Sequence, residues 1–560
     1  MVEESKTHQN HYPYSVDSSE IDDISAHAAG STGQPPIVLS GTRFVIVFVS
    51  LLLGLFMATL DQTILTTALP LISSEFNASD QLGWVGSAYL LTSSGFQPIY
   101  GIFADIIGHK TVYLISLSIF LFGSILCGAS KTMFMLIMSR AVQGVGAAGL
   151  ITILLIIICD LVSPRERPKY MGGLGVAIGV ATLAGPLLGG YFADRRIWRW
   201  AFYMNGFVGI VVVAAIVVFF KLPTHRVSDE PMRVQMKRAD YAPVFLMMPG
   251  TICILAALQV GGANTSWSST NCIVLFTVGF ALFAIFIACE IWVVPYPFIP
   301  RRFVMSRTNM AICLANFMGG ATDYAIMFFV PLYFQLVHGD SATSSALELL
   351  PFFISAVIAS FITGIIISMT GRYRLILWLG CAMTVVGTAL LQTTTVDMPR
   401  SLQYFYLGIL GFGTGLCKQT FIVAGQVAAD PKDLSLATSI SQFFRIFGGA
   451  CGISVAETIF SFRTKAGLAD LSKKMHQNFS IQNIALIKFL PAAARRQVQI
   501  VSVDAIDMIY RFTIGCCAAG LLASFLVKHY DIWTDESKVQ PTAANGNGTT
   551  HNKASDGSNA

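Results

Sequence analysis

Long apolar segments alternate with short polar connectors along nearly the whole chain. A helix needs roughly 20 predominantly apolar residues to cross a bilayer. Counting such runs predicts fourteen membrane-spanning helices, at 44–69, 82–104, 111–129, 133–158, 170–192, 201–220, 242–261, 272–294, 309–336, 345–369, 375–393, 402–427, 434–459 and 507–528. Thirteen spans is the alternative, and it would place the two ends of the chain on opposite sides of the membrane.

Composition supports the membrane as solvent. Hydrophobic residues make up 54% of the 560 residues and charged residues only 12%, about half the charged share of a typical soluble domain. We therefore expect an all-α polytopic membrane protein. The net charge of +5 is spread along the chain and predicts no nucleic-acid partner. The eleven cysteines lie in or beside apolar runs at spacings that fit no disulfide framework or metal site, so we expect no metal and no cofactor.

Polar ends and charged connectors divide the chain into five parts. The polar ends read as disordered cytoplasmic tails. The predicted division is a tail at 1–42, an N-terminal six-helix half at 43–220, an extra helix pair with charged connectors at 221–308, a C-terminal six-helix half at 309–529 and a tail at 530–560.

Basic residues set the expected orientation. With the amino terminus in the cytoplasm, the short inward connectors hold fifteen Lys and Arg residues and the short outward connectors five. The sequons at Asn77, Asn264 and Asn478 then fall outside, which predicts glycosylation. The stretch 460–505 carries seven basic residues and is predicted to be a long outer loop.

A short polar hinge separates the second and third spans. Gly101 and Gly108 stand seven residues apart, with Asp105 between them and Lys110 at the basic end. Glycines allow close helix approach and tight turning, and an acid is favoured near a helix N-terminus. The alternative is an ordinary glycine-rich turn.

The hinge recurs later in the chain. A shift of 263 residues leads to Gly364 and Gly371, again between two spans, with Ser368 in place of the acid. This repetition predicts two related six-helix halves, with a substrate path at their interface.

Asp61 is a carboxyl group well inside the first span. A charge at the bilayer centre costs about 2.5–3.5 kcal/mol on insertion scales. We therefore expect Asp61 to face an aqueous cavity, to be paired, or to be protonated. A carboxyl that burial keeps protonated could carry a proton; the alternative is a structural hydrogen-bonding acid.

Arg140 is the matching cation in the fourth span, with Gln143 one turn further on. A guanidinium does not deprotonate in proteins, so Arg140 can favour proton release from a nearby acid or bind an anionic group. The alternative is an arginine that holds helices together through backbone carbonyls.

The fifth span ends in Gly185, Pro186, Gly189 and Gly190. Proline removes one backbone hydrogen bond and glycine allows close contact, which suits a helix that bends.

Two further charges lie within later spans, Asp323 in the ninth and Lys418 in the twelfth. Because each is costly alone, we predict that they line a central cavity, as a pair or separately. A purely structural ion pair is the alternative. Gln143, Gln426 and Arg445 are the other candidates for that cavity.

Several of these elements resemble the major facilitator superfamily. The hinge is similar to its signature cytoplasmic loop, Gly-x-x-x-Asp-x-x-Gly-Arg/His-Lys. Leu60-Asp61-Gln62-Thr63-Ile64 resembles the first-span element of the fourteen-span drug:proton antiporters, with Thr66 where many members have Asn. The Arg140 and Gly185 segments resemble the family's Arg-x-x-Gln-Gly-x-Gly and Gly-Pro-x-x-Gly-Gly elements. The resemblance runs from about residue 44 to 528 and is greatest to fungal toxin and multidrug efflux pumps.

The resemblance implies the major facilitator fold and alternating access. The expected function is proton-coupled export of an amphiphilic small molecule, such as a secondary metabolite, toxin or drug. Asp61 and Arg140 would couple protons, Asp105 would latch the inner gate, and Gly185 to Gly190 would let span five flex. The expected partners are a small-molecule substrate, protons and the bilayer. The protein is expected to be monomeric in the plasma membrane, with the vacuolar membrane as the alternative.

Two other functions stay open at this stage. The same fold could take up siderophores or other small molecules, and the chain could be a non-transporting membrane sensor whose tails recruit partners. An enzyme is not expected, because no nucleophile elbow, phosphate loop or metal-ligand spacing occurs.

Overall fold

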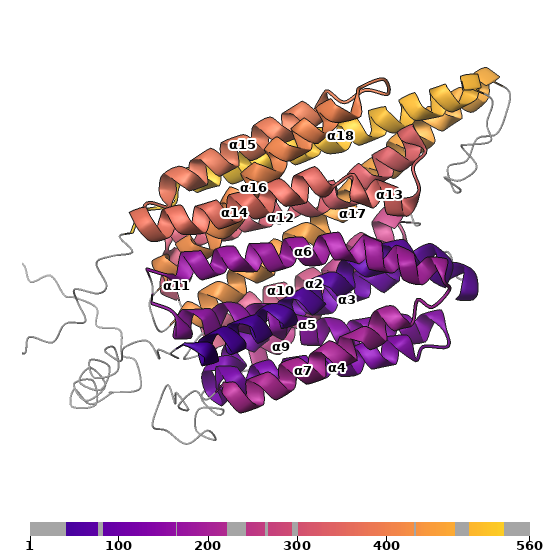
Figure 1. The fold of residues 1–560 in the computed structure, drawn as a ribbon. Coiled ribbons are helices and arrows are strands. Elements are labelled where there is room, and N and C mark those ends of the chain that lie inside the picture. The colour runs from indigo at the N-terminus through magenta and orange to yellow at the C-terminus, as the bar shows by residue number, and fades with distance from the viewer. Residues whose placement is uncertain are drawn as a thin grey trace, which may run out of the picture.

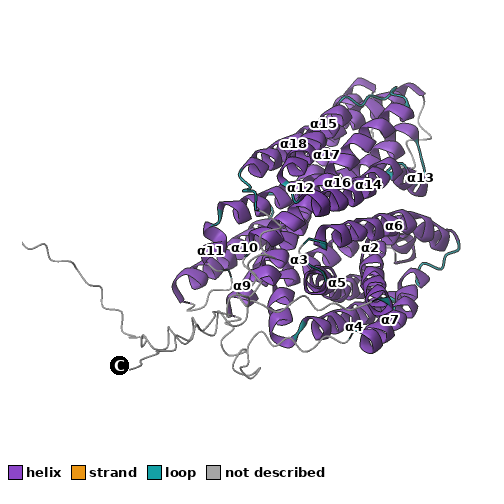
Figure 2. Ribbon diagram, turned by 60° about the vertical axis from the view of Figure 1, so that its left-hand side comes forward, coloured by secondary structure: helices purple, strands orange, loops and turns teal. Residues whose placement is uncertain are grey.

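A computed structural model describes residues 41–76, 82–163, 165–220, 242–263, 267–293, 299, 301–429, 433–475 and 492–530. Within these ranges the regular secondary structure is helical (Figure 2). The predicted tails at 1–42 and 530–560 lie almost entirely outside the described residues.

The first six helices of the described residues form one bundle, coloured indigo to magenta in Figure 1. We call it the N-terminal half. Within it, α2 packs against α6 and α7, and α5 packs against α3 and α4. Its members are α2 (Thr42–Phe76), α3 (Leu82–Ile107), α4 (His109–Gly128), α5 (Met133–Leu161), α6 (Arg167–Asp194) and α7 (Trp200–Phe219).

A second bundle, which we call the C-terminal half, repeats this arrangement. Here α12 packs against α17 and α18, and α16 packs against α14 and α15. The half is built from α12 (Arg307–Tyr333), η3 (Phe334–His338), α13 (Ala342–Leu347), α14 (Leu350–Thr370), α15 (Arg374–Gln392), α16 (Arg400–Ala428), α17 (Leu434–Met475) and α18 (Ala492–Phe525).

Two additional long helices lie between the halves in sequence. They are α9 (Ala242–Ala263) and α10 (Thr270–Ala288), and η2 (Cys289–Val293) continues α10. The short α11 (Arg301–Met305) then leads into α12. The helices α9 and α10 pack on each other, and α9 also contacts α3 and α17, where the two halves meet.

Residue types at the helix ends explain where several helices begin and stop. Thr132, Ser269 and Ser306 each accept a hydrogen bond from the backbone N–H three residues further on, at the start of α5, α10 and α12. Gly108 and Gly371 have φ angles of 96° and 67° at the ends of α3 and α14. Positive φ is unstrained mainly for glycine, so these two residues allow the chain to turn between adjacent helices.

Each predicted apolar run coincides with one of these helices or with a helix and the short helical segment next to it. Twelve helices in the described residues are long and apolar enough to cross a membrane. The helix α3 is not among them, since Ser93, Ser94 and Gln97 lie at its centre, and the apolar stretch of α9 covers only Leu246–Leu258. The count of fourteen spans therefore stays a prediction.

The prediction of a long loop at 460–505 is wrong for the residues that the structure describes, because most of them are helical. Within its described residues, α17 continues without a break to Met475 and α18 already begins at Ala492. The two extensions pack together, with Leu468 and Leu471 against Val498. Charged residues are more frequent in this stretch than in the chain as a whole, so hydropathy marks the end of the apolar run but not the end of the helix.

The internal repetition is visible in matching glycine contacts. A methyl group placed on Gly144 of α5 would lie 2.4 Å from the Tyr89 carbonyl oxygen of α3. A methyl group on Gly411 of α16 would lie 2.1 Å from the Phe352 carbonyl oxygen of α14. Tyr89 and Phe352 are separated by the same 263 residues that relate the two glycine hinges, so both halves use one packing scheme.

The halves meet through α3 with α17 and through α6 with α14. The contacts are close on the side where α3 ends and α4 begins, which we call the hinge side. A methyl group on Gly101 would lie 2.3 Å from Ser439 Oγ, and one on Gly364 would lie 2.3 Å from the Pro168 carbonyl oxygen. On this side the backbones of the two halves are in direct contact.

Candidate functional site

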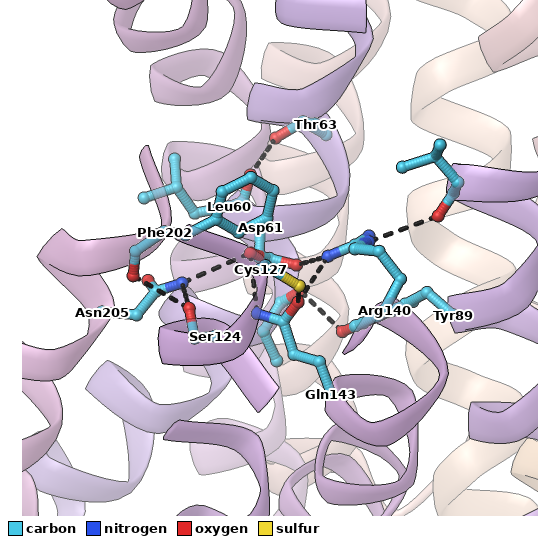
Figure 3. A network of polar contacts seen from close by, with 12 residues as sticks. Leu60, Asp61, Thr63, Tyr89, Ser124, Cys127, Arg140, Gln143, Phe202 and Asn205 are labelled. Carbon is cyan, nitrogen blue, oxygen red and sulfur yellow. Dashed lines mark hydrogen bonds and ion pairs between the residues drawn. The ribbon is translucent and has the colours of Figure 1, made fainter. Parts of the chain in front are cut away.

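A buried ion pair lies at the centre of the N-terminal half (Figure 3). Asp61 of α2 accepts a charge-assisted hydrogen bond from Arg140 Nη1 of α5. The same Nη1 donates to Gln143 Oε1 at 2.7 Å, and Gln143 Nε2 donates to Asp61 Oδ1 at 2.9 Å. The three side chains therefore form a closed ring of hydrogen bonds.

A second arm reaches the carboxylate from α7. Asn205 Nδ2 donates to Asp61 Oδ1 at 3.3 Å and to Ser124 Oγ of α4 at 3.0 Å. Ser124 in turn donates to the Phe202 carbonyl at 2.9 Å. Four helices of the N-terminal half thus converge on one carboxyl group.

The arginine is held from its other side. Arg140 Nε donates to the Val85 carbonyl at 3.3 Å, and the guanidinium carbon lies 4.4 Å from the Tyr89 ring centroid. A cation over an aromatic face is attracted by the negative face of the ring. Asp61 and Arg140 are both about 1% exposed, so the pair is neutral as a unit and sealed from solvent.

A second charged cluster lies in the C-terminal half. Asp323 Oδ2 of α12 accepts a hydrogen bond from Arg445 Nη2 of α17 and lies 3.7 Å from Lys418 Nζ of α16. Asp323 and Lys418, which the sequence predicts to line a cavity as a pair or separately, lie close together, and Arg445 joins them as a third member. Unlike the first pair, this cluster borders open space, because Asp323, Lys418 and Arg445 all line one cleft.

The charged hinge residues Asp105 and Lys110 contact other residues of the N-terminal half. Asp105 lies 3.6 Å from His109 Nε2, and the other ring nitrogen of His109 is bonded to Asp160 at the end of α5. Lys110 Nζ donates to the Val217 carbonyl at 3.3 Å, at the C-terminus of α7. A cation is favoured at that end of a helix, so Lys110 ties α4 to α7.

One hydrogen bond across the halves comes from the repeated hinge. Ser368, at the position that matches Asp105, donates through its hydroxyl to the Arg165 carbonyl at 2.8 Å. Asp105 itself is paired with His109 of its own half, and its role as a latch between the halves stays a proposal.

The glycine-rich end of the fifth span lies within α6. A methyl group on Gly185 would lie 2.0 Å from Thr63 Oγ1 of α2, two residues beyond Asp61. Pro186 lies inside the continuous helix, and Gly189 and Gly190 are buried. The helix α6 therefore connects the neighbourhood of Asp61 to the contact with α14.

The remaining candidates lie in different places. Gln143 is fully buried in the Asp61 ring rather than beside a cavity. Gln426 borders a small separate space between α16 and α17, and its Nε2 has no hydrogen-bond partner in the described structure. Asn77, Asn264 and Asn478 lie outside the described residues.

Sequence reasoning did not single out two of the groups in contact with functional residues. Asn205 and Ser124 are neutral polar residues within apolar helices, and only the fold shows that they support the Asp61 carboxylate.

Glu75, near the end of α2, accepts hydrogen bonds from Trp198 Nε1 at 2.6 Å and Arg199 Nη1 at 2.8 Å.

Comparison with known proteins matches this architecture. A family model described as Major Facilitator Superfamily covers residues 51–453. The chain belongs to the major facilitator superfamily. As a member it is a multi-pass membrane transporter rather than an enzyme, and a small molecule is its substrate.

Named fungal relatives of this superfamily cover most of the chain. The MFS-type efflux pump MFS1 of Arthroderma benhamiae is 31% identical over 509 residues, which is 90% of this chain and 95% of the relative. Efflux pump roqT of Penicillium rubens is 34% identical over 447 residues, 79% of this chain and 83% of the relative. Efflux pump aflT of Aspergillus parasiticus is 33% identical over 439 residues, with coverages of 77% and 84%.

Solved structures share the fold at low identity. The human organic anion transporter MFSD10 superposes with a TM-score of 0.57 at 15% identity, covering 87% of this chain and all of that one. A bacterial homolog to the human lysosomal transporter Spinster, in an inward-facing and unoccupied conformation, gives 0.53 at 16% identity, with coverages of 87% and 98%. These likenesses confirm the major facilitator fold predicted from the sequence.

Proposed function

We propose that this protein is a proton-coupled exporter of amphiphilic organic molecules such as secondary metabolites, toxins or drugs. The direction is supported by relatives that are named efflux pumps and cover most of the chain. The predicted plasma-membrane location and the outward release of cargo belong to this proposal.

The observation that carries proton coupling is the sealed pair of Asp61 and Arg140. Breaking a buried ion pair by removing one partner costs about 3–5 kcal/mol. A proton that binds Asp61 removes the carboxylate charge and leaves the arginine cation uncompensated among α2, α3 and α5. The N-terminal half is then driven to rearrange, and a change in proton occupancy becomes a change in helix packing.

Alternating access supplies the route for that proton. In the described conformation the halves are in contact on the hinge side, where Ser368 reaches Arg165 and Gly101 faces Ser439. The charge bias of the connectors assigns this side to the cytoplasm. We infer that rocking of the halves opens the hinge side and exposes Asp61 in turn. The glycine-rich segment of α6 would bend during this movement and so link the surroundings of Asp61 to the contact between α6 and α14.

The driving force is sufficient for useful export. One elementary charge that moves through 100 mV gains about 2.3 kcal/mol. Tight coupling to a neutral cargo then allows a roughly fifty-fold concentration ratio, since 1.4 kcal/mol is a factor of ten.

Proteoliposomes with an imposed pH step test the proposal. A panel of fungal toxins is added, and proton flux and cargo movement are measured together. We expect cargo-dependent proton flux in the wild type and its loss in Asp61→Asn, because asparagine cannot bind and release a proton. Asp504→Asn is the matched control, because Asp504 is an exposed acid on the extension of α18.

Two outcomes would contradict the proposal. Cargo-dependent proton flux that survives Asp61→Asn removes this residue from coupling, and cargo that crosses equally fast without a gradient makes the protein a passive facilitator. Whole-cell accumulation of an iron chelate, with no efflux of any toxin, would favour the uptake alternative.

A further inference from the structure

The C-terminal half contains a cleft beside its charged cluster, whereas Asp61 and Arg140 of the N-terminal half are buried. It lies between α12, α15, α16, α17 and α18 and measures about 440 Å³ when the open solvent at its mouth is counted, of which only a small part is enclosed. Asp61 lies among α2, α4, α5 and α7, which are the counterparts of α12, α15, α16 and α18 in the repeat. Equivalent helices therefore surround a buried hydrogen-bond network in one half and an open cleft in the other.

Charges around the cleft do not balance. Arg445 is always protonated in proteins, and a protonated Lys418 adds a second cation. Asp323 is the single acidic side chain in the lining, and one of its oxygens faces both cations. An uncompensated charge within the hydrocarbon region is costly. The cleft therefore has a net positive charge and space beside it.

Lys418 is the cation directed to that space. Its side chain is 43% exposed, against 13% for Arg445 and 8% for Asp323. Its Nζ lies 3.7 Å from Asp323 Oδ2, which is longer than a hydrogen bond. The ammonium thus has donor capacity that the nearest acid does not use.

The other polar groups of the cleft do not compete for an anion. The hydroxyls of Thr322, Thr384 and Thr414 each donate to a backbone carbonyl of their own helix, at 3.1, 2.9 and 2.9 Å. The N–H groups of Lys418 and Arg445 are therefore the strong donors that remain for a bound molecule.

We propose that this cleft binds the acidic group of an organic monoanion, a carboxylate or an ionised enol, through Lys418, with Arg445 and Asp323 as the fixed base of the site. A charge-assisted hydrogen bond from an ammonium to such an oxygen is about twice as strong as a neutral one. The neutral lining, which includes Ala315, Gly319 and Phe421, takes the apolar carbon skeleton next to the anion.

The statement that the bound anion is part of the cargo rests on the proposed export function. Binding itself can be measured without a proton gradient. Purified full-length protein in nanodiscs is therefore titrated with 9-anthracenecarboxylate and with its neutral methyl ester, and empty nanodiscs correct for partitioning. We expect the carboxylate to bind about tenfold more tightly than the ester. Benzoate should displace it, whereas sodium chloride at the same concentration should not.

Three variants isolate the lysine. Lys418→Gln should lower the preference for the carboxylate to within about threefold, and it should still fold because Asp323 and Arg445 remain a neutral pair. Lys418→Arg should keep the preference. Lys465→Gln, an exposed lysine on the extension of α17, should change nothing. Elution as a monodisperse peak and an unchanged Tm confirm that each variant is folded.

Each failure has a distinct meaning. An equal preference in Lys418→Gln and the wild type, or none in the wild type, overturns the inference. Displacement by chloride as effective as that by benzoate assigns the cleft to an inorganic anion and also overturns it. Normal binding without any proton-driven transport contradicts the proposed function alone, and proton-driven export of the ester with no carboxylate preference contradicts the cleft alone.

Discussion

Both halves place an acid on their first helix beside a base on their fourth, yet the two acids differ in their other partners and in their exposure to solvent. Asp61 is enclosed by Arg140, Gln143 and Asn205 and is shut off from solvent. Asp323 faces two cations and borders a cleft. The two halves share one helix scaffold but carry different polar side chains on it.

The difference favours a division of tasks between the halves. A neutral, fully hydrogen-bonded pair responds to few ligands other than a proton, because no space remains for a larger one. A cluster with an excess cation and adjacent space can accept a molecule. We therefore expect substitutions in the first cluster to affect folding and coupling, and those in the second to affect cargo choice.

The largest expected effect comes from removing each arginine. Arg140→Met leaves the Asp61 carboxylate buried without a cation, at a cost of about 3–5 kcal/mol in the free energy of unfolding. Arg445→Met should cost about 1–3 kcal/mol, because Lys418 remains near Asp323. Chemical unfolding in detergent measures both, with the exposed Arg511→Met as the control. Equal losses at the two positions would remove the proposed contrast between the clusters.

Alanine at the paired glycines tests the shared scaffold. Gly144→Ala and Gly411→Ala each force a methyl group against a backbone carbonyl, so each should destabilise by about 1–3 kcal/mol. Gly408→Ala is a control with open space around it. Thermal unfolding of the three variants should give similar shifts for the first two. A large shift in one half alone would show that the packing scheme is not equivalent.

A charge exchange tests the second cluster. Asp323→Lys alone places three cations together, and Lys418→Asp alone places two acids beside Arg445, so each should lower toxin resistance in whole cells. The double exchange restores the original charges, so its toxin resistance should be at least about threefold higher than that of the less resistant single variant. Absence of any recovery would show that these two side chains do not act as a pair.

The smallest effect is expected at Glu75, a feature of the N-terminal half near the end of α2. Partial burial acts to raise the pKa of its carboxyl, but hydrogen bonds from Trp198 and Arg199 outweigh it and hold the pKa below the usual 4.5. A lowered carboxyl pKa stabilises the fold above about pH 4.5, and this contribution is lost as pH falls through the lower folded value.

Glu75→Gln should therefore reduce stability at pH 7 by no more than about 1 kcal/mol, since the pair is partly exposed. The difference in Tm between the variant and the wild type should shrink towards pH 4. A difference that is independent of pH would mean that the carboxylate charge is not what stabilises this contact.

Much of this picture follows from the sequence. Apolar run length locates the helices, because the hydrocarbon core fixes how long a span must be. Lone charges in such runs need partners or water, which is why Asp323 and Lys418 could be predicted to line a cavity as a pair or separately. The family motifs identify Asp61 and Arg140.

The remainder depends on the fold. Gln143 has the same chemistry whether it faces a cavity or a carboxylate, and only packing assigns it to Asp61. Arg445 is 122 residues from Asp323, so nothing local connects them. The cleft beside Lys418 depends on how the side-chain volumes of five helices add up, and no single helix determines it.

One consequence follows from the length of α17. Its 42 residues extend about 63 Å at 1.5 Å per residue, against a hydrocarbon core of about 30 Å. Together with the extension of α18 it projects from the C-terminal half as a stiff arm (Figure 1). A small tilt of that half is magnified at the tip of the arm. A fluorophore attached there would report each turnover as a displacement much larger than any movement at the charged clusters.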